Sequence, residues 1–427
     1  MKTLLHILPV FFLSAILSQL HSQEYFMEIE GGKNYTRSVF VDLKNQEQTQ
    51  VDYTTWDIAF STDDRAVSIL INEAVPTGED AVPIELYSTS AEDFSDVDTS
   101  QIIKILYNGE TSNSQGAFNA AKDPDDPFDY GWGAYDRATH FLTGNRIFII
   151  RLRDQSYVKF RVAQFDPFTG TYTFEYADIE SDEVTLDSIR LSEYSGKSLV
   201  YYSLENEKTV EVEPDRWDLK FTRYNTPIPD EDEILDYYVY GVLVRPGVEV
   251  AKVTDVNFEQ VNYEDYADQL SGDLDAIGYD WKFIDLNSFQ YSVEEDVVFF
   301  VKTEEGEVYK VQFIDFTGAS TAVTTIHVAL AEVLTSNYEL PDFIKEAKVF
   351  PNPVTGERIN LQFTSEITSN HSVIRIIDMQ GREVYADQVS ILTGENRISL
   401  PFTTGSGMYL ISVTTDRDHW IVPFLSH

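Results

Sequence analysis

The chain has 427 residues, which is too many for one small hydrophobic core, and this length predicts two to four domains. Asp and Glu number 72 against 31 Lys and Arg, so the formal net charge is −41, and such a surface repels phosphate backbones and argues against nucleic acid as a partner. The chain has no cysteine, whereas Tyr and Phe number 25 and 27, an aromatic content that favours β structure.

Residues 1–22 have the pattern of a signal peptide. Lys2 supplies a positive charge, residues 4–17 are apolar, and residues 18–23 are polar. The absence of Cys at this exit excludes a lipoprotein anchor, and an exported chain without disulfides must rely on its cores alone. No later stretch approaches the roughly 18–20 apolar residues that a transmembrane helix needs. The sequence therefore predicts a protein that is secreted or held at the outer face of the cell, with no transmembrane helix in its mature form.

Residues 39–60 and 200–221 are two copies of one pattern, aligned without a gap at an offset of 161 residues. Each copy has a β-type run, a polar turn and a second run ending in Trp-Asp-x-x-Phe, which predicts a β-hairpin. On an extended segment Trp56 and Phe60 lie on the same face. Solenoid units recur every 20–50 residues or so, and this wider spacing instead predicts two duplicated domains. The identical positions are Val39/Val200, Leu43/Leu204, Asn45/Asn206, Val51/Val212, Trp56/Trp217, Asp57/Asp218 and Phe60/Phe221.

A second set of shared anchors follows each hairpin. Tyr130-Gly131-Trp132 corresponds to Tyr279-Asp280-Trp281, and two β-type runs follow in each copy. The offset here is 148 to 151 residues, so the segment between hairpin and anchor is about a dozen residues shorter in the second copy, as loop trimming would produce. The repeat predicts two β domains, at 24–190 and 195–335, each large enough to fold alone.

A third unit is predicted at residues 348–427, after a linker at 337–346. Short alternating runs separated by Gly-containing turns predict a small β-sandwich. The unit resembles the type A sorting domain of the type IX secretion system. The motifs that carry this resemblance are Lys348–Val354 (KVFPNPV), Asp378–Val384 (DMQGREV), Gly394-Glu395-Asn396 and Gly407–Leu410 (GMYL).

This resemblance implies export across the inner membrane by the signal peptide and then across the outer membrane by the type IX secretion machinery. Members of the family are usually cleaved near the start of the domain, and are then released or attached to surface lipopolysaccharide. The last run, His419–Phe424, departs from the Lys-rich end that is frequent in the family, and this departure leaves the processing route open.

The duplicated domains resemble the HmuY-like haem-binding proteins, which are all-β. The resemblance rests on short motifs in each copy, and together with the sorting unit it predicts an all-β chain. These motifs are Trp56–Phe60, Tyr130–Trp132, Ile147–Ile150 and Tyr157–Val162 in the first copy, and Trp217–Phe221, Tyr279–Trp281, Val297–Val301 and Tyr309–Phe313 in the second.

The resemblance implies haem as a cofactor and His140 as its ligand. Relatives hold haem iron between two axial ligands, usually histidines and sometimes methionine. His140 is the one histidine of the mature first copy, Phe289 aligns with it in the second copy, and the second copy has only His327. The second axial ligand stays open between Met27, a tyrosine and a group from another molecule. The residue pattern itself favours an ordinary loop position for His140 and a strand position for His327.

The other chemistry-bearing residues favour structural roles. The four Trp that recur in both copies favour core packing over the wall of a ligand cleft. Asp57 and Asp218 stand beside two of these Trp, and a turn or strand-edge hydrogen bond is favoured over catalysis. The acidic runs Asp123–Asp126 and Asp230–Glu233 lack the spaced loop of a calcium site, so no metal site is predicted.

No enzymatic motif is present: there is no Cys nucleophile, H-E-x-x-H, G-x-S-x-G or phosphate loop. The sequence therefore predicts a secreted, non-enzymatic protein that captures a ligand at or outside the cell surface. Haem or another porphyrin is the ligand that the resemblance implies. The alternative is a structural or adhesive surface protein that binds protein or glycan.

Overall fold

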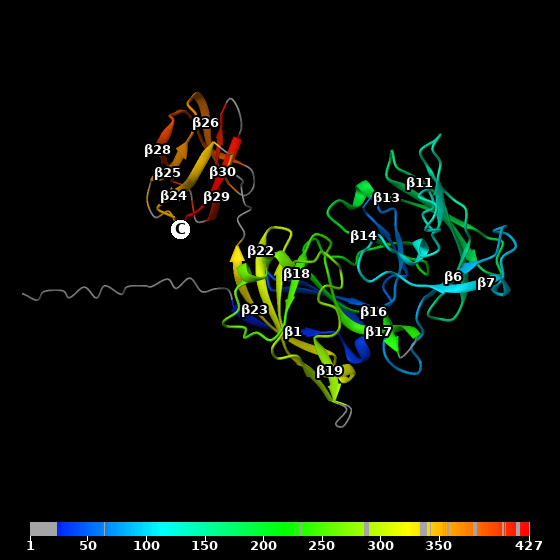
Figure 1. Ribbon diagram of the computed structural model, residues 1–427. Coiled ribbons are helices and arrows are strands. Elements are labelled where there is room, and N and C mark those ends of the chain that lie inside the picture. The colour runs from blue at the N-terminus through cyan, green and yellow to red at the C-terminus, as the bar shows by residue number, and fades with distance from the viewer. Residues whose placement is uncertain are drawn as a thin grey trace, which may run out of the picture. The chain divides into compact units, whose positions relative to one another are not determined.

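The computed structural model confirms the predicted all-β class (Figure 1). Among the residues that it describes there are strands and short 3₁₀ turns but no α-helix, and no helix is long and apolar enough to cross a membrane. The predicted signal peptide and part of the predicted linker lie outside these residues. The described residues are 24–63, 65–230, 233–285, 290–333, 340–341, 343–352, 354, 356, 358–378, 382–403, 405, 407–415 and 419–426.

The chain divides into two compact units, the first ending at Glu332 and the second beginning at Val333. The first unit holds both repeats. In repeat one the strands are β1 (Glu24–Glu30), β2 (Arg37–Asp42), β3 (Glu47–Asp52), β4 (Ile58–Ser61), β5 (Ile69–Ile71), β6 (Glu85–Thr89), β7 (Ile102–Leu106), β8 (Gly133–Tyr135), β9 (Leu142–Gly144), β10 (Phe148–Arg151), β11 (Tyr157–Asp166), β12 (Thr171–Asp178) and β13 (Thr185–Arg190).

Repeat two supplies the remaining strands of the first unit. These are β14 (Leu199–Ser203), β15 (Lys208–Val210), β16 (Leu219–Asp230), β17 (Glu233–Val244), β18 (Glu249–Val253), β19 (Lys282–Asp285), β20 (Gln290–Val293), β21 (Val298–Lys302), β22 (Glu307–Phe316) and β23 (Val323–Val333). The 3₁₀ turns are η1 (Lys33–Tyr35), η2 (Thr99–Gln101), η3 (Ala117–Asn119), η4 (Leu191–Tyr194), η5 (Tyr263–Asp265), η6 (Ala267–Gln269) and η7 (Gly318–Ser320).

The two repeats exchange their hairpins. Hairpin β2–β3 of repeat one pairs with β16 of repeat two, in the order β17-β16-β2-β3, and hairpin β14–β15 of repeat two pairs with β4 of repeat one, in the order β15-β14-β4-β5. The registers are equivalent: Val39 lies opposite Phe221 in one sheet, and Val200 lies opposite Phe60 in the other. Strand β1 also crosses, because it pairs antiparallel with β23 (Figure 1). The tandem boundaries at 24–190 and 195–335 are thus not confirmed, since strands cross them in both directions.

Two main cores result, each closed by strands of the other repeat. Core one contains residues from β4, β5 and β10–β12 together with Val200, Tyr202 and Leu204 of repeat two. Core two contains residues from β16–β18 and β21–β23 together with residues of β1 and β2 of repeat one. Other residues of the two four-stranded sheets pack into a third, smaller core, which we call the shared core. This shared core is Phe40, Val51, Trp56, Ala59, Leu70, Leu199, Tyr201, Val212 and Trp217.

The alternation of side chains on each exchanged strand explains this division. Successive residues of a strand point to opposite faces. On β2, Val39 and Val41 therefore face core two while Phe40 faces the shared core. The prediction that Trp56 and Phe60 share a face is wrong, because β4 begins only at Ile58: Trp56 packs in the shared core and Phe60 in core one.

The second unit is built of two antiparallel sheets, β24-β25-β28 and β27-β26-β29-β30. Residues from both sheets pack into one core that includes Leu361, Ile376 and the buried Trp420, the arrangement of a small sandwich. Strand β24 begins inside the segment predicted as linker. The strands are β24 (Ile344–Phe350), β25 (Arg358–Ser365), β26 (Ser369–Asp378), β27 (Glu383–Ile391), β28 (Gly394–Pro401), β29 (Gly407–Thr414) and β30 (His419–Ser426).

Candidate functional site

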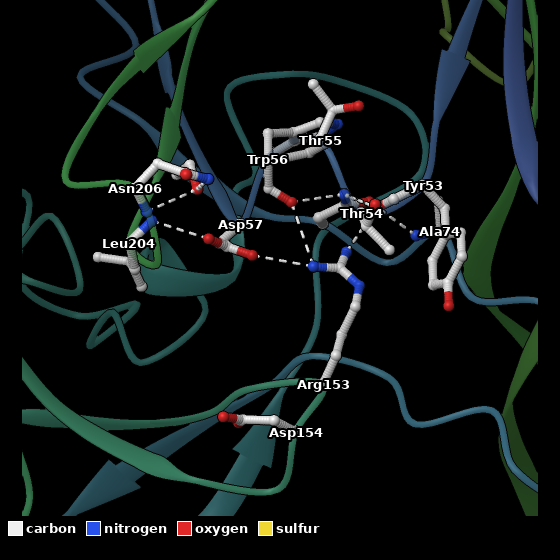
Figure 2. Close-up of polar contacts among 12 residues, drawn as sticks. Tyr53, Thr54, Thr55, Trp56, Asp57, Ala74, Arg153, Asp154, Leu204 and Asn206 are labelled. Carbon is white, nitrogen blue, oxygen red and sulfur yellow. Dashed lines mark hydrogen bonds and ion pairs between the residues drawn. The ribbon is translucent and has the colours of Figure 1, made fainter.

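The Asp of the repeated Trp-Asp motif joins the two repeats. Asp57 accepts a hydrogen bond on Oδ2 from the backbone N–H of Leu204 at 2.7 Å, and its own N–H donates to the carbonyl of Tyr202 at 2.9 Å. Arg153 donates from Nη1 to Asp57 Oδ1 at 2.9 Å and from Nη2 to the carbonyl of Tyr53 at 2.8 Å (Figure 2). Each of these groups is largely buried, so the carboxylate is fully engaged in holding the exchanged hairpin.

Asp218 makes the reciprocal contacts in repeat two. It accepts on Oδ2 from the N–H of Leu43 at 2.8 Å, and its N–H donates to the carbonyl of Val41 at 2.8 Å. The carboxyl groups of Asp42 and Glu305 lie nearby, and so does the guanidinium of Arg245, whose charge opposes theirs. Burial, followed by these two carboxylate charges, raises the pKa of Asp218 to about 7, although the Leu43 hydrogen bond opposes the shift. Both aspartates hold strands together, as the sequence favoured.

The four repeated Trp are buried. Trp132 and Trp281 are fully enclosed, in core one and core two respectively. Trp56 packs edge-on against Tyr201, and Trp217 packs edge-on against Phe40, with ring centroids 4.9 and 5.0 Å apart. Because Phe40 and Tyr201 are equivalent positions of the repeat, these two contacts are the same contact made in both directions.

His140 lies on an exposed turn between β8 and β9. Its backbone has φ of 65°, a left-handed conformation, and its N–H donates to the carbonyl of Asp136 at 2.8 Å. The imidazole Nδ1 is 2.6 Å from the Tyr135 hydroxyl, and the ring lies edge-on to that of Phe168 at 6.4 Å between centroids. Phe168 is 73% exposed, so the histidine and this phenyl ring form an open aromatic surface.

The structure does not bring the other haem-ligand candidates to His140. Met27 lies on β1 with its side chain in core two, opposite Ile326. His327 is buried on β23 between the rings of Phe26 and Phe258, whose centroids are 4.4 and 4.0 Å from its own. Its Nε2 is 2.7 Å from a carboxylate oxygen of Glu24. Phe289, the counterpart of His140, lies outside the described residues.

Acidic clusters do not form an evident metal site. No group of three or more His, Cys, Asp or Glu side chains in the described part of the chain is arranged to hold a metal ion. In the run that begins at Asp123, the carboxylates accept backbone hydrogen bonds from neighbouring loop residues, such as the N–H of Asp125 at 3.0 Å. The run Asp230–Glu233 lies only partly within the described residues.

Sequence reasoning missed two residues that the fold places in prominent positions. Arg153 pairs with Asp57, which is 96 residues away in the sequence, and no local sequence pattern predicts that pairing. Asn225, on β16, is 2% exposed and lies at the wall of a hollow of about 680 Å³ in the first unit. The longer segment between hairpin and anchor in repeat one was the one sequence signal near this hollow, because part of that segment lines it.

No curated protein matches this chain in sequence. Among solved structures, latent dimeric PorU from Porphyromonas gingivalis aligns at 11% identity over 94% of this chain and 34% of that one, with a TM-score of 0.17. The BSP domain of a biofilm-associated protein aligns at 9% identity over 94% of this chain and 81% of that one, also with a TM-score of 0.17. This chain thus spans about a third of PorU, and TM-scores of this size carry no argument about function.

The C-terminal unit has a clear relative. Residues 348–423 match the secretion system C-terminal sorting domain family, over the same segment in which the sequence motifs were found. This match fits the two-sheet unit that begins at Val333. The chain therefore carries a type IX secretion sorting domain at its C-terminal end, which engages the type IX machinery and makes this a secreted or cell-surface protein.

Proposed function

We propose that this exported protein captures a ligand outside the cell and that the turn of His140 is a contact site for haem or a related porphyrin. The observation that carries the proposal is the open surface formed by His140, Tyr135 and Phe168. An imidazole nitrogen is a suitable donor for haem iron, and exposed aromatic rings provide flat apolar surface for a porphyrin face.

The residues present would supply one ligand to haem iron from this chain, His140. The Tyr135 hydroxyl occupies Nδ1 of His140, and Nε2 has no hydrogen-bond partner among the described residues, so Nε2 is the atom free to bind iron. Bound haem would supply an iron atom that accepts this nitrogen as a ligand. Arg137, in the same turn, lies over the Phe128 ring at 4.1 Å and is an exposed cation for a carboxylate of the porphyrin. Met27 is held in core two, so a second ligand to the iron would be a tyrosine or a group from another molecule.

Hemin titration of the mature chain, followed at the Soret band, tests this proposal. We expect a shifted band at one equivalent, with lower affinity than a site with two histidines. His140→Asn should abolish the shift, because Asn accepts the left-handed backbone but has no imidazole. Tyr237→Ala, an exposed aromatic position on β17, is the matched control and should bind hemin like the unaltered protein.

A Soret shift that survives His140→Asn would contradict the assignment of the ligand. No Soret change with the unaltered protein would contradict haem capture altogether, and would favour the structural or adhesive alternative.

A further inference from the structure

A second site lies within the first unit, away from His140. A hollow of about 680 Å³ opens between the repeat-one segment of residues 107–130 and the hairpin β16–β17 of repeat two. This volume is within the range of about 300–1,000 Å³ that is typical of small-molecule sites. The side chains that matter for its chemistry are Tyr107, Tyr130, Arg65, Lys122, Asn225 and Asp236.

Asn225 places a fixed hydrogen-bond donor in the wall of this hollow. Its backbone N–H donates to Glu73 Oε2 at 3.2 Å, and Glu73 Oε1 accepts from the N–H of Asn108 at 2.8 Å. The side-chain Nδ2 of Asn225 is buried and has no acceptor among the described residues. The wall of the hollow covers this amide, so a ligand oxygen in the hollow becomes its partner once the covering side chains shift.

The floor of the hollow is rigid. Asn108 accepts on Oδ1 from the N–H of Ile71 at 3.1 Å and of Ala117 at 3.0 Å, and it donates from Nδ2 to the carbonyl of Ile71 at 2.9 Å. Gly116 lies so close to β5 that a Cβ there would stand 2.2 Å from the carbonyl oxygen of Ile69. The loop is therefore pinned to β5 before any ligand arrives, which reduces the entropy that binding must offset.

The charges of the lining indicate an uncharged ligand. Arg65 and Lys122 are matched by Glu110 and Asp236, so the lining has no net formal charge although the chain carries −41. No Leu, Ile, Val, Met, Phe or Trp belongs to the described lining, which disfavours a lipid or a porphyrin. The two tyrosines provide ring surface, and the remaining side chains provide donors and acceptors in mixed order.

We propose that this hollow binds a neutral saccharide. Sugar hydroxyl groups both donate and accept, which suits a lining of amide, carboxylate and cationic groups. The apolar faces of pyranose rings suit contact with Tyr107 and Tyr130. The donor at Asn225 Nδ2 pairs with a hydroxyl or acetamido oxygen of the sugar.

The site arises from the differences between the repeats. The segment between hairpin and Trp anchor is about a dozen residues longer in repeat one than in repeat two, and it contributes the 107–130 side of the hollow. Strands β16 and β17 have 12 residues each, whereas β4 and β5 have 4 and 3. The longer hairpin contributes Asn225 and Asp236 to the opposite side.

Isothermal titration of the mature full-length chain with maltotriose, cellotriose, mannotriose and triacetylchitotriose tests the proposal. We expect at least one of them to bind with one site per chain. Ala120→Trp, which fills the hollow from an exposed position in its lining, should abolish binding without lowering the melting temperature. Asn225→Ala should weaken binding by about tenfold, the effect of losing one hydrogen bond to a buried donor.

Two control variants separate this site from the haem proposal. Tyr237→Ala, near the hollow on β17 but outside its lining, and His140→Asn should each leave saccharide affinity within about twofold of the unaltered protein. The proposal is overturned if no trisaccharide of the panel binds at concentrations up to about 10 mM. It is equally overturned if binding persists in Ala120→Trp, or if an anionic heparin tetrasaccharide binds in place of the neutral sugars.

Discussion

Two equivalent aspartates, Asp57 and Asp218, hold the exchanged hairpins, but their electrostatic surroundings differ. Asp57 pairs with Arg153, and the two side chains are 8% and 15% exposed. Asp218 has Asp42 and Glu305 nearby, and burial, followed by these two charges, raises its pKa to about 7 against the lowering effects of the Leu43 hydrogen bond and of Arg245. The charge of Asp57 is therefore neutralised by Arg153, whereas Asp218 becomes charged only near neutral pH.

This difference predicts a pH-dependent stability that is specific to Asp218. A carboxyl group whose pKa rises from 3.8 to about 7 on folding stabilises the protein when protonated, and that stabilisation is lost as pH rises through 7. Asp218→Asn keeps the acceptor for Leu43 N–H and removes the charge. Between pH 5 and pH 8 the unaltered protein should lose on the order of 3 kcal/mol of unfolding free energy through this group. Asp218→Asn should not show this loss.

Denaturant unfolding of both proteins at pH 5 and pH 8 measures this change. Asp57→Asn is the matched control, and it should instead lose about 3 kcal/mol at both pH values because it leaves Arg153 buried without its carboxylate. A stability profile of Asp218→Asn parallel to that of the unaltered protein would refute the assignment. Glu73, whose pKa burial also raises to about 7, leaves a residual slope in every variant.

At the scale of elements, the exchanged strands contribute to the core of the other repeat. Tyr202, on β14 of repeat two, is 1% exposed in core one, where its hydroxyl donates to Asp187 Oδ2 at 2.7 Å. Tyr309, on β22, is equally buried, but in core two. Two tyrosines of the same repeat therefore support different cores.

Tyr202→Ala is expected to reduce hydrogen-exchange protection in β11 and β12 of repeat one, because it opens a cavity in core one at a cost of about 3–5 kcal/mol. Tyr309→Ala, the control, should reduce protection in β21 and β23 of repeat two. Loss of protection confined to repeat two in both variants would show that the hairpins are not exchanged.

The sequence predicted local structure better than it predicted pairing. Alternating apolar residues and the polar turns identified both hairpins; composition favoured β structure, and the two family resemblances predicted the all-β class. Whether a hairpin joins β4 or β16 is not encoded locally, because Val39 and Val200 occupy equivalent positions and either hairpin presents a similar apolar face to either strand. The hollow was missed for a related reason: Asn225 and Tyr107 are far apart in sequence and line the same hollow only in the folded chain.

At the scale of the whole molecule, the sorting unit is separable from the duplicated unit. The second compact unit begins at Val333, and the sorting-domain match at residues 348–423 lies entirely within it. The residues that direct export are therefore separate from the duplicated unit. The sequence predicted a loop position for His140. Its exposure became clear only from the structure, in which it lies on the turn between β8 and β9. Its role as a haem ligand stays a prediction.

Deletion of residues 348–427 is expected to leave the first unit folded and to retain it in the periplasm. Cell fractionation and immunoblotting measure this outcome, and a β-rich circular dichroism spectrum of the purified truncated protein controls for misfolding. Wild-type amounts of the truncated protein in the medium or at the surface would be inconsistent with a sorting function for this unit.

The central structural claim is that the two repeats form one interlocked body. Ser38 Oγ on β2 and Thr222 Oγ1 on β16 are buried and 2.7 Å apart, and the chain has no cysteine of its own. The double variant Ser38→Cys, Thr222→Cys should form one disulfide in the mature protein, detected as a linked peptide pair by mass spectrometry without reduction. Each single variant, Ser38→Cys or Thr222→Cys, should keep its one thiol free. Free thiols at positions 38 and 222 in the folded, oxidised protein would contradict the exchange.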